Sequence, residues 1–348
     1  WTDYSDNEIA HFRAWLGAIR YDGIAKLNDA WGTEYASFTE VEPPRAPSLE
    51  AEWMDWLDFR FDAMGERKAW MYQTIRESDR GRPAFTCNHG SFYYGKEFAA
   101  MGADFGRYAW NSDGFETGQI VRDTDPDFYN LLYIDSILGL GKPYAPARQA
   151  YVDPDPSARG GSRSFTPDAV WRYGLESLAA GAWHLGYIEY EGTLPDGEWQ
   201  IAGTPADRAT AEFFDWSQRV AERLEGFHPL LPTVGVWHSH EHWALYGFED
   251  EWRALHRELI RRHVPKNFVY DIQLAANAIP DDALMLVPGA EQAHGHAIRG
   301  LLLRAVRGGD TIWAGDAPDG PAFFALQQGG PRMMMVPELD VRRVAESI

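Results

Sequence analysis

Residues 143–151 read PYAPARQAY, residues 166–180 read TPDAVWRYGLESLAA, and residues 182–191 read AWHLGYIEYE. The first and third segments predict extended strands, and the second predicts a helix. Strands that alternate with helices of this length indicate parallel βαβ units. This stretch therefore predicts an α/β protein built on a parallel sheet.

The same alternation extends towards the amino terminus. Further strands are expected at 83–88 and 105–111, and further helices near Glu97 and over 126–138. The four strands are half the number in a (β/α)8 or TIM barrel, so we expect a partial barrel. Upstream, Ser5 and Glu8 have the spacing of a capping box and predict a helix start. Apolar residues spaced from Trp53 to Ile75 predict a long amphipathic helix that ends before Gly81.

A second α/β series begins after Pro229 and Pro232. Its expected strands cover 233–237, 268–270, 283–287 and 311–314, and a helix lies around Trp252. This order of elements predicts a small flavodoxin-like α/β domain. We therefore predict two domains, residues 1–225 and residues 226–348.

Composition excludes several classes of partner. The chain has 348 residues and a formal net charge of −20, a field that repels phosphate backbones and anionic lipid heads. Nucleic acid and membrane surfaces are therefore not expected as partners, and no apolar run approaches the roughly 18 residues of a membrane span. The single cysteine, Cys87, cannot form an internal disulfide, which favours a reducing compartment and a cytoplasmic location.

Several short segments resemble glycoside hydrolase family 42, the β-galactosidases of the large retaining barrel clan. Residues 12–16 (FRAWL) and 25–33 (AKLNDAWGT) resemble the family segment that follows strand four. The later matches keep the family order, with Gly81-Arg82-Pro83 at strand five, Tyr108-Ala109-Trp110-Asn111 at strand six, Lys142-Pro143-Tyr144 at strand seven and Gly181-Ala182-Trp183 at strand eight. The resemblance implies strands five to eight of the barrel, a carbohydrate substrate, a trimerisation domain and hence a homo-oligomer.

The carboxylates that the family uses are not at their usual places. Retaining hydrolysis needs two carboxyl groups about 5–5.5 Å apart. Asn7-Glu8 has the residue types of the family's acid/base pair, but Glu8 belongs to the capping box of a helix. We therefore expect that the acid/base glutamate lies upstream of Trp1 or has been lost. Counting from Pro143, the nucleophile position falls on Arg148, whose guanidinium cannot attack. Arg148 could instead bind a sugar acid or pair with a neighbouring acidic side chain.

Glu189 and Glu191 are the candidate catalytic residues. They alternate with Tyr190, so they point to one side near the carboxyl end of a strand, where barrel enzymes hold their catalytic groups. A salt-bridged rim is the alternative interpretation. The candidate substrate-binding residues, taken from family positions or from their chemistry, are Asn88, Trp110, Asn111, Arg148 and Glu198. Trp110 could equally be a core residue.

No cofactor or metal is expected. His238, His240 and His242 alternate along a predicted strand, where side chains two apart stand about 6.6 Å from each other, too far for three imidazoles to share one ion. We interpret them as a solvated strand end. The leading hypothesis is a glycoside hydrolase that acts on β-galactosides or related sugars. The alternative is a catalytically impaired sugar-binding or assembly module.

Overall fold

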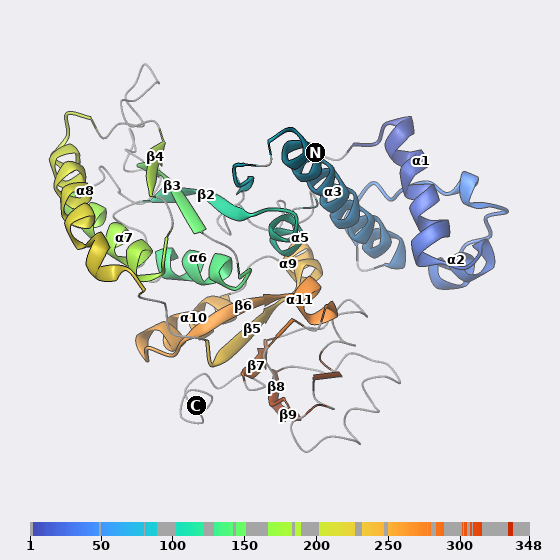
Figure 1. Cartoon of the computed structure of the whole chain (residues 1–348). Helices are drawn as coiled ribbons and strands as arrows, with labels where there is room; N and C mark the ends of the chain where they lie inside the picture. Colours follow the sequence, from blue (N-terminus) through green and yellow to red (C-terminus); the bar gives the residue numbers. More distant parts are fainter. Residues whose placement is uncertain are drawn as a thin grey trace, which may run out of the picture.

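The computed structural model describes residues 3–48, 50–79, 81–88, 102, 104–121, 129–141, 144–150, 166–182, 185–188, 202–226, 232–246, 250–276, 278–279, 283–288, 301, 303–304, 307, 309–314 and 333–336. Its first sheet, sheet A, has four strands: β1 (Phe85–Asn88), β2 (Gly114–Val121), β3 (Tyr144–Ala150) and β4 (Gly186–Ile188). The strands follow the order β1-β2-β3-β4 and all pairs are parallel. Figure 1 labels β2, β3 and β4 side by side. The predicted parallel α/β architecture is confirmed.

The helices associated with sheet A are α3 (Ala51–Ser78), α5 (Phe105–Trp110), α6 (Tyr129–Leu138), α7 (Pro167–Ala179) and α8 (Pro205–Leu224). α7 begins as its sequence predicts, because the Thr166 side chain accepts a hydrogen bond from the backbone N–H of Ala169 and Pro167 occupies the first turn. α7 and α8 pack through a separate apolar cluster around Tyr173 and Phe213. The long helix predicted from Trp53 to Ile75 is confirmed as α3.

The strand predicted at 105–111 is wrong. This segment forms α5, and the second strand of sheet A lies further along the chain, at β2. The cause is local: the Asp104 carboxylate accepts a hydrogen bond from the Arg107 N–H at 3.0 Å and so caps a helix. The aromatic run that suggested a strand instead places Tyr108 in the core and leaves Trp110 exposed at the end of the helix.

The amino-terminal helices form a module, residues 3–48 with the first half of α3, that has its own aromatic core. It contains α1 (Asp6–Trp15), a π-helical turn (Leu16–Arg20), α2 (Ile24–Trp31) and a 3-10 turn (Phe38–Glu40). The predicted helix start is confirmed in part: Ser5 Oγ accepts from the Glu8 N–H at 3.3 Å. The reciprocal bond is not made by Glu8, since the Ser5 N–H donates to the Asp3 carboxylate at 2.8 Å.

A buried carboxylate organises the polar side of this module. Asp55 on α3 is 1 % exposed and accepts three hydrogen bonds, from Arg20 Nε (2.7 Å), the Tyr21 hydroxyl (2.5 Å) and Trp31 Nε1 (2.8 Å). Burial and the neighbouring Asp55 raise the pKa of Tyr21 to about 12, so the hydroxyl keeps its proton and remains a donor. One side chain therefore joins α2, α3 and the turn between α1 and α2.

The second sheet, sheet B, contains β5 (Val234–His238), β6 (Lys266–Tyr270), β7 (Leu284–Val287), β8 (Thr311–Ala314) and β9 (Met333–Val336). The order is β6-β5-β7-β8-β9, again with every pair parallel. Helices α9 (His240–Tyr246), α10 (Asp250–Arg261) and α11 (Asp271–Ala275) accompany it. The first four strands agree with the predicted segments, whereas β9 was not predicted.

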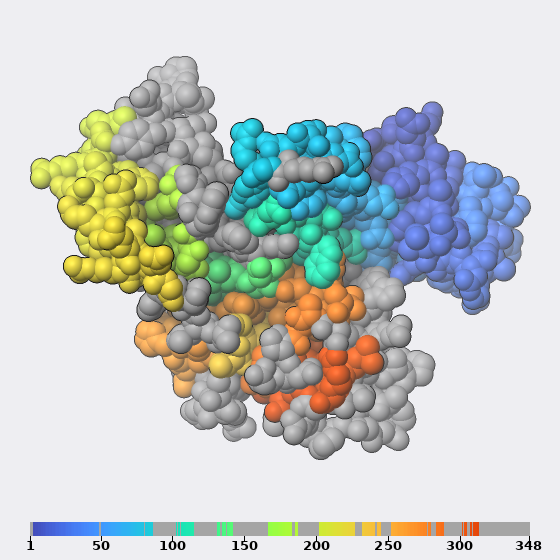
Figure 2. All heavy atoms as spheres, in the orientation of Figure 1, coloured from blue at the N-terminus to red at the C-terminus, as the bar shows by residue number. Residues whose placement is uncertain are grey.

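Sheet B packs against α3, α5 and α6, and we call this contact the junction. One hydrophobic cluster joins Leu57, Tyr108 and Leu132 on one side to Val234 and Phe268 on the other. The predicted boundary between residues 225 and 226 follows α8 directly, and this cluster contains residues from both sides of it. In Figure 2 the green atoms of the α6 region lie directly against the orange atoms of sheet B.

Helix α6 lies against β6, which is one of the two outer strands of sheet B in the described part of the chain. The Tyr270 hydroxyl donates to the Ser136 carbonyl at 2.9 Å, and Gln273 Nε2 donates to the Gly139 carbonyl at 2.5 Å. The Lys266 ammonium forms an ion pair with Asp135. Gly139 is close enough to the Phe268 carbonyl oxygen that a Cβ atom at this position would overlap it. The approach of helix to strand therefore requires glycine.

None of the described helices is both long enough and apolar enough to cross a membrane.

Candidate functional site

The carboxyl edge of sheet A is the place where we expect the residues of an active site. All four strands are parallel, so their last residues, Asn88, Val121, Ala150 and Ile188, mark the same edge. In β/α barrels the loops at this edge carry the catalytic groups. The sheet therefore provides a candidate site that four separate segments of the chain could reach.

The register of sheet A places several predicted site positions at this edge. Arg148 in β3 pairs with Gln119 in β2 and with Tyr187 in β4. Neighbouring strands run about 4.8 Å apart, so these three backbone positions form one row across the sheet. Asn88 is the last residue of β1. The Asn88 and Arg148 side chains lie outside the described residues.

Three predicted site residues cannot be located in the described part of the chain. Glu189 directly follows the last residue of β4, Glu191 comes two residues later, and Glu198 lies in the next stretch; all three fall outside the described residues. Because Tyr187 pairs with Arg148, the end of β4 is adjacent to the Arg148 strand. Glu189 is therefore the first residue after β4, the strand that pairs with β3.

Trp110 and Asn111 are not at this edge, which corrects their predicted placement. They end α5 and precede β2, so they lie at the amino end of that strand. From Gly114 to Gln119, the position paired with Arg148, the strand extends about 17 Å. Trp110 is 56 % exposed, and Asn111 Nδ2 donates to the Arg107 carbonyl at 3.2 Å. The structure therefore does not bring these two residues together with Arg148.

Asp113 connects the elements at the amino edge of sheet A. Its carboxylate accepts from the Ala84 N–H and from the Tyr72 hydroxyl, both at 2.8 Å, and lies 3.5 Å from the Arg76 guanidinium. The Asp113 N–H donates to the Ala84 carbonyl at 2.9 Å. This residue joins β1 and β2 to α3, which is a structural role at the edge opposite the candidate site.

The solvated strand end predicted for the three alternating histidines is wrong. His238, His240 and His242 are 2 %, 1 % and 9 % exposed. His238 ends β5 and α9 begins at His240, so the chain turns at this point and does not continue as a strand. α3 and α5 pack over the turn from outside sheet B, which the local sequence could not indicate. Among the described residues, no group of three or more His, Cys, Asp or Glu could hold a metal ion.

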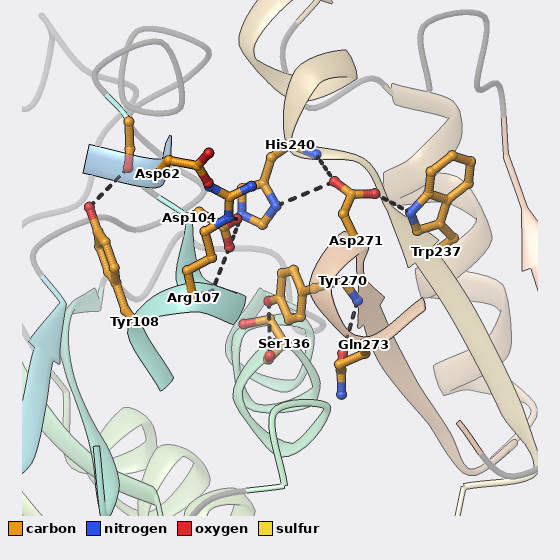
Figure 3. Close-up of polar contacts among 11 residues, drawn as sticks. Asp62, Asp104, Arg107, Tyr108, Ser136, Trp237, His240, Tyr270, Asp271 and Gln273 are labelled. Carbon is orange, nitrogen blue, oxygen red and sulfur yellow. Dashed lines mark hydrogen bonds and ion pairs between the residues drawn. The ribbon is translucent and has the colours of Figure 1, made fainter. Parts of the chain in front are cut away.

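A polar network surrounds the buried side chain of His240 (Figure 3). Arg107 forms ion pairs with Asp62 and with Asp104, the latter at 3.0 Å, and Asp104 Oδ1 lies 3.5 Å from His240 Nε2. On the other side, Asp271 accepts from the His240 backbone N–H at 3.0 Å and from Trp237 Nε1 at 2.7 Å. The network was not predicted, because its members lie on α3, α5, β5, α9 and α11 and no local spacing relates them.

Burial determines the charge state of the histidines in this region. It lowers the pKa of His240, and the positive charge of Arg107 lowers it further, whereas Asp104 opposes the shift. Burial also lowers the pKa of His238 and of His256 well below the usual value. These imidazoles are therefore neutral at pH 7. The network joins α3 and α5 to α9 and α11 across the junction, so we assign it a structural role and not a catalytic one.

An apolar groove of about 530 Å³ lies between α7 and α8. Its lining residues are Leu175, Leu178, Ala179, Gly181, Ala182, Trp216, Ser217, Gln218, Ala221 and Leu224. None of them is a carboxylate, so this groove cannot supply the acid and the nucleophile of a glycosidase.

Comparisons with known proteins agree with the fold. Residues 1–195 match the glycoside hydrolase family 42 model, described as β-galactosidase. The β-galactosidase Bga of Halorubrum lacusprofundi is 26 % identical over 275 residues, which cover 70 % of this chain and 37 % of that protein. A β-galactosidase of a Thermus species is 28 % identical over 252 residues, covering 64 % and 37 %.

Solved structures of family 42 proteins have a fold similar to that of this chain. The exo-carrageenase GH42 from Bacteroides ovatus aligns with a TM-score of 0.77 at 14 % identity, covering 99 % of this chain and 51 % of that chain. The β-galactosidase from Bacillus circulans sp. alkalophilus aligns with a TM-score of 0.69 at 16 % identity, covering 89 % and 49 %. The chain thus has the fold of an α/β glycoside hydrolase. Because the family model matches more than half of it, the chain belongs to glycoside hydrolase family 42. It spans 37 % of the length of the two relatives above.

Proposed function

We propose that this chain carries the second half of a family 42 barrel and takes part in hydrolysing β-galactosides or related sugars with retention of configuration. The observation that carries the proposal is sheet A: four parallel strands with their carboxyl ends at one edge, within the segment that matches the family. In this proposal β1 to β4 are strands five to eight of the barrel. The order of sheet B, β6-β5-β7-β8-β9, supports a flavodoxin-like second domain, because it corresponds to the 2-1-3-4-5 order of that fold.

Glu189 and Glu191 are the proposed catalytic carboxylates of this half. Both follow the last residue of β4 within three positions of the sequence, and β4 ends at the candidate edge. Asn88 ends β1, and Arg148 lies near the same edge in β3, with β2 between them. Both are proposed to contact the sugar, together with Glu198. A guanidinium in this position favours a substrate with a carboxylate or another anionic group. Trp110 and Asn111 have no part in this proposal, because they lie at the opposite edge.

Substitution of the two glutamates tests the catalytic assignment. Glu189→Gln and Glu191→Gln should each lower the kcat for a chromogenic galactoside by about 100-fold or more, since each removes a proton-transfer or nucleophilic group and keeps the shape of the side chain. The matched control is Glu212→Gln, which removes the exposed ion pair with Arg208 on α8 and should leave kcat unchanged. Turnover that survives in both variants would exclude these residues as the catalysts. Galactose binding without turnover in the unmodified chain would overturn the hydrolase proposal itself.

Sheet A also predicts assembly. In the described part of the chain β1 and β4 are its outer strands, and an uncovered parallel edge favours pairing with further strands. We therefore propose that the sheet is completed by pairing with another polypeptide segment and that the protein is a homo-oligomer. Multi-angle light scattering should give a mass that is a multiple of 39.4 kDa. A well-behaved species of single-chain mass would contradict this.

A further inference from the structure

The register of sheet A assigns each strand position to one of the two faces of the sheet. Successive residues of a strand alternate between the faces, and paired residues of neighbouring strands share a face. The row of Gln119, Arg148 and Tyr187 therefore lies on one face, which we call the Arg148 face. Thr117, two residues before Gln119, lies on the same face, and so does Asn88, its partner in β1. All four strands thus place a polar residue type on this face near the carboxyl edge.

The opposite face has a different composition near this edge. Its last two complete rows across β2, β3 and β4 are Gly118, Ala147 and Gly186, then Ile120, Gln149 and Ile188. Five of these six are glycine, alanine or isoleucine, which suit a face that is covered by helices. The polar positions therefore gather on the Arg148 face and not evenly on both.

Arg148 is an unusual residue for its place in the sheet. Strands of parallel sheets are normally covered on both faces and are rich in valine, isoleucine and leucine. β3 has a neighbouring strand on each side, and Arg148 is its one charged residue. A guanidinium in the middle of a sheet is unfavourable unless an anionic group pairs with it.

The strands of sheet A, as far as the structure describes them, place no acidic residue on the Arg148 face. Their one acidic residue is Glu116, which pairs with Cys87 and Ala145 and so lies on the opposite face. Glu189, the first residue after β4, could also pair with Arg148. Arg148 thus has two competing roles, an ion pair within the protein or a contact with an anionic substrate, and these predict different results below.

We propose that Arg148 selects a substrate whose sugar carries an anionic group, a carboxylate or a sulfate, in preference to a neutral galactoside. This inference rests on the proposed hydrolase site, because it uses the same carboxyl edge. A planar guanidinium donates two parallel hydrogen bonds to two oxygens of such a group. Gln119 and Tyr187, one strand away on each side, are residue types that can bind sugar hydroxyls. The net charge of −20 gives no general attraction for an anion, so the selection depends on this local charge.

Calorimetric titration of the unmodified chain tests the selection without requiring turnover. The probes are galactose, galacturonic acid and galactose 6-sulfate, which share one sugar ring and differ in the group at C6. At least one anionic sugar should bind about tenfold more tightly than galactose, because hydrogen bonds between charged groups are stronger than neutral ones. The tighter of the two identifies the carboxylate or the sulfate as the preferred group. Failure of both anionic sugars to bind more tightly than galactose would overturn the proposal.

Substitution of Arg148 assigns the selection to its guanidinium. Arg148→Gln should weaken binding of the preferred anionic sugar by about 10- to 100-fold and change galactose binding by less than about threefold. Arg148→Lys keeps the charge but not the paired donors, so its loss should be intermediate. The matched control, Arg219→Gln, removes an exposed ion pair with Asp215 on α8 and should leave all three affinities unchanged.

Two outcomes of this series would contradict the selection. A preference that persists in Arg148→Gln would mean that another group binds the anion. An equal loss for all three sugars would indicate that Arg148 pairs with a carboxylate of the protein. The preference of the unmodified chain decides the question even where the variant does not fold.

Turnover separates this inference from the hydrolase proposal. With the p-nitrophenyl β-glycosides of galactose and of the preferred anionic sugar, Arg148→Gln should raise the KM of the anionic substrate by about 10- to 100-fold and leave that of the neutral one nearly unchanged. An anionic sugar that binds tightly but is not hydrolysed would support the selection and contradict the hydrolase proposal. Hydrolysis of the neutral galactoside without any preference for the anionic one would do the reverse.

Discussion

Replacing Asp55 with alanine should lower the free energy of unfolding by about 3 kcal/mol, because it removes a buried carboxylate that accepts hydrogen bonds from three side chains. The carboxylate is 1 % exposed and accepts from Arg20, Tyr21 and Trp31. Without it, the Tyr21 hydroxyl and Trp31 Nε1 lose their acceptor, and the Arg20 guanidinium keeps only its 3.5 Å contact with Asp58. Urea denaturation followed by tryptophan fluorescence measures the change.

Asp22→Ala is the matched control for this experiment. Asp22 also pairs with a basic residue, Lys26 at 2.5 Å, but both side chains are largely exposed. Water and salt screen such a pair, so we expect no measurable change in stability. If Asp55→Ala were as stable as this control, the three hydrogen bonds would not be holding the module together.

Gly139→Ala should lower the free energy of unfolding by about 3 kcal/mol or more. The added Cβ would overlap the Phe268 carbonyl oxygen, which belongs to the backbone of β6 and cannot rotate away. Relief requires α6 to move from the strand, and that movement weakens the hydrogen bonds from Gln273 and Tyr270 described above. The same denaturation experiment measures it.

Gly81→Ala controls for the change of residue type. A Cβ at Gly81 would meet only the Asp79 carboxylate at 3.6 Å, an ordinary contact with a flexible side chain. Its stability should stay within about 0.5 kcal/mol of the unmodified chain. A stable Gly139→Ala variant would mean that α6 does not approach β6 as closely as the structure has it.

The sequence predicted the elements whose signals are local. The strands at 83–88, 143–151 and 233–237 and the long helix α3 follow from apolar spacing and from prolines and glycines that bound them. The segment 105–111 was predicted wrongly because its aromatic residues favour a strand, whereas the capping carboxylate of Asp104 favours a helix. β9 was missed because its methionines have neither the branching nor the aromatic rings typical of strands.

For the candidate site, the sequence predicted only which strands carry or precede the site residues. The strand that contains Arg148 pairs with the strand that ends directly before Glu189, whereas the roles of Arg148 and Glu189 stay predictions. Trp110 was misplaced together with its strand. The polar network around His240 could not be predicted, because α5 and α9 lie more than 100 residues apart in the sequence and meet only at the junction.

The continuous core across the junction constrains how this protein can be recombined. A chimaera that takes residues 226–348 from a relative would separate Phe268 and Lys266 from the α6 residues that contact them. Exchangeable pieces should therefore include α5 and α6 together with sheet B. For the same reason, we expect the two halves to diverge in step during evolution, with paired changes at Gly139 and along β6.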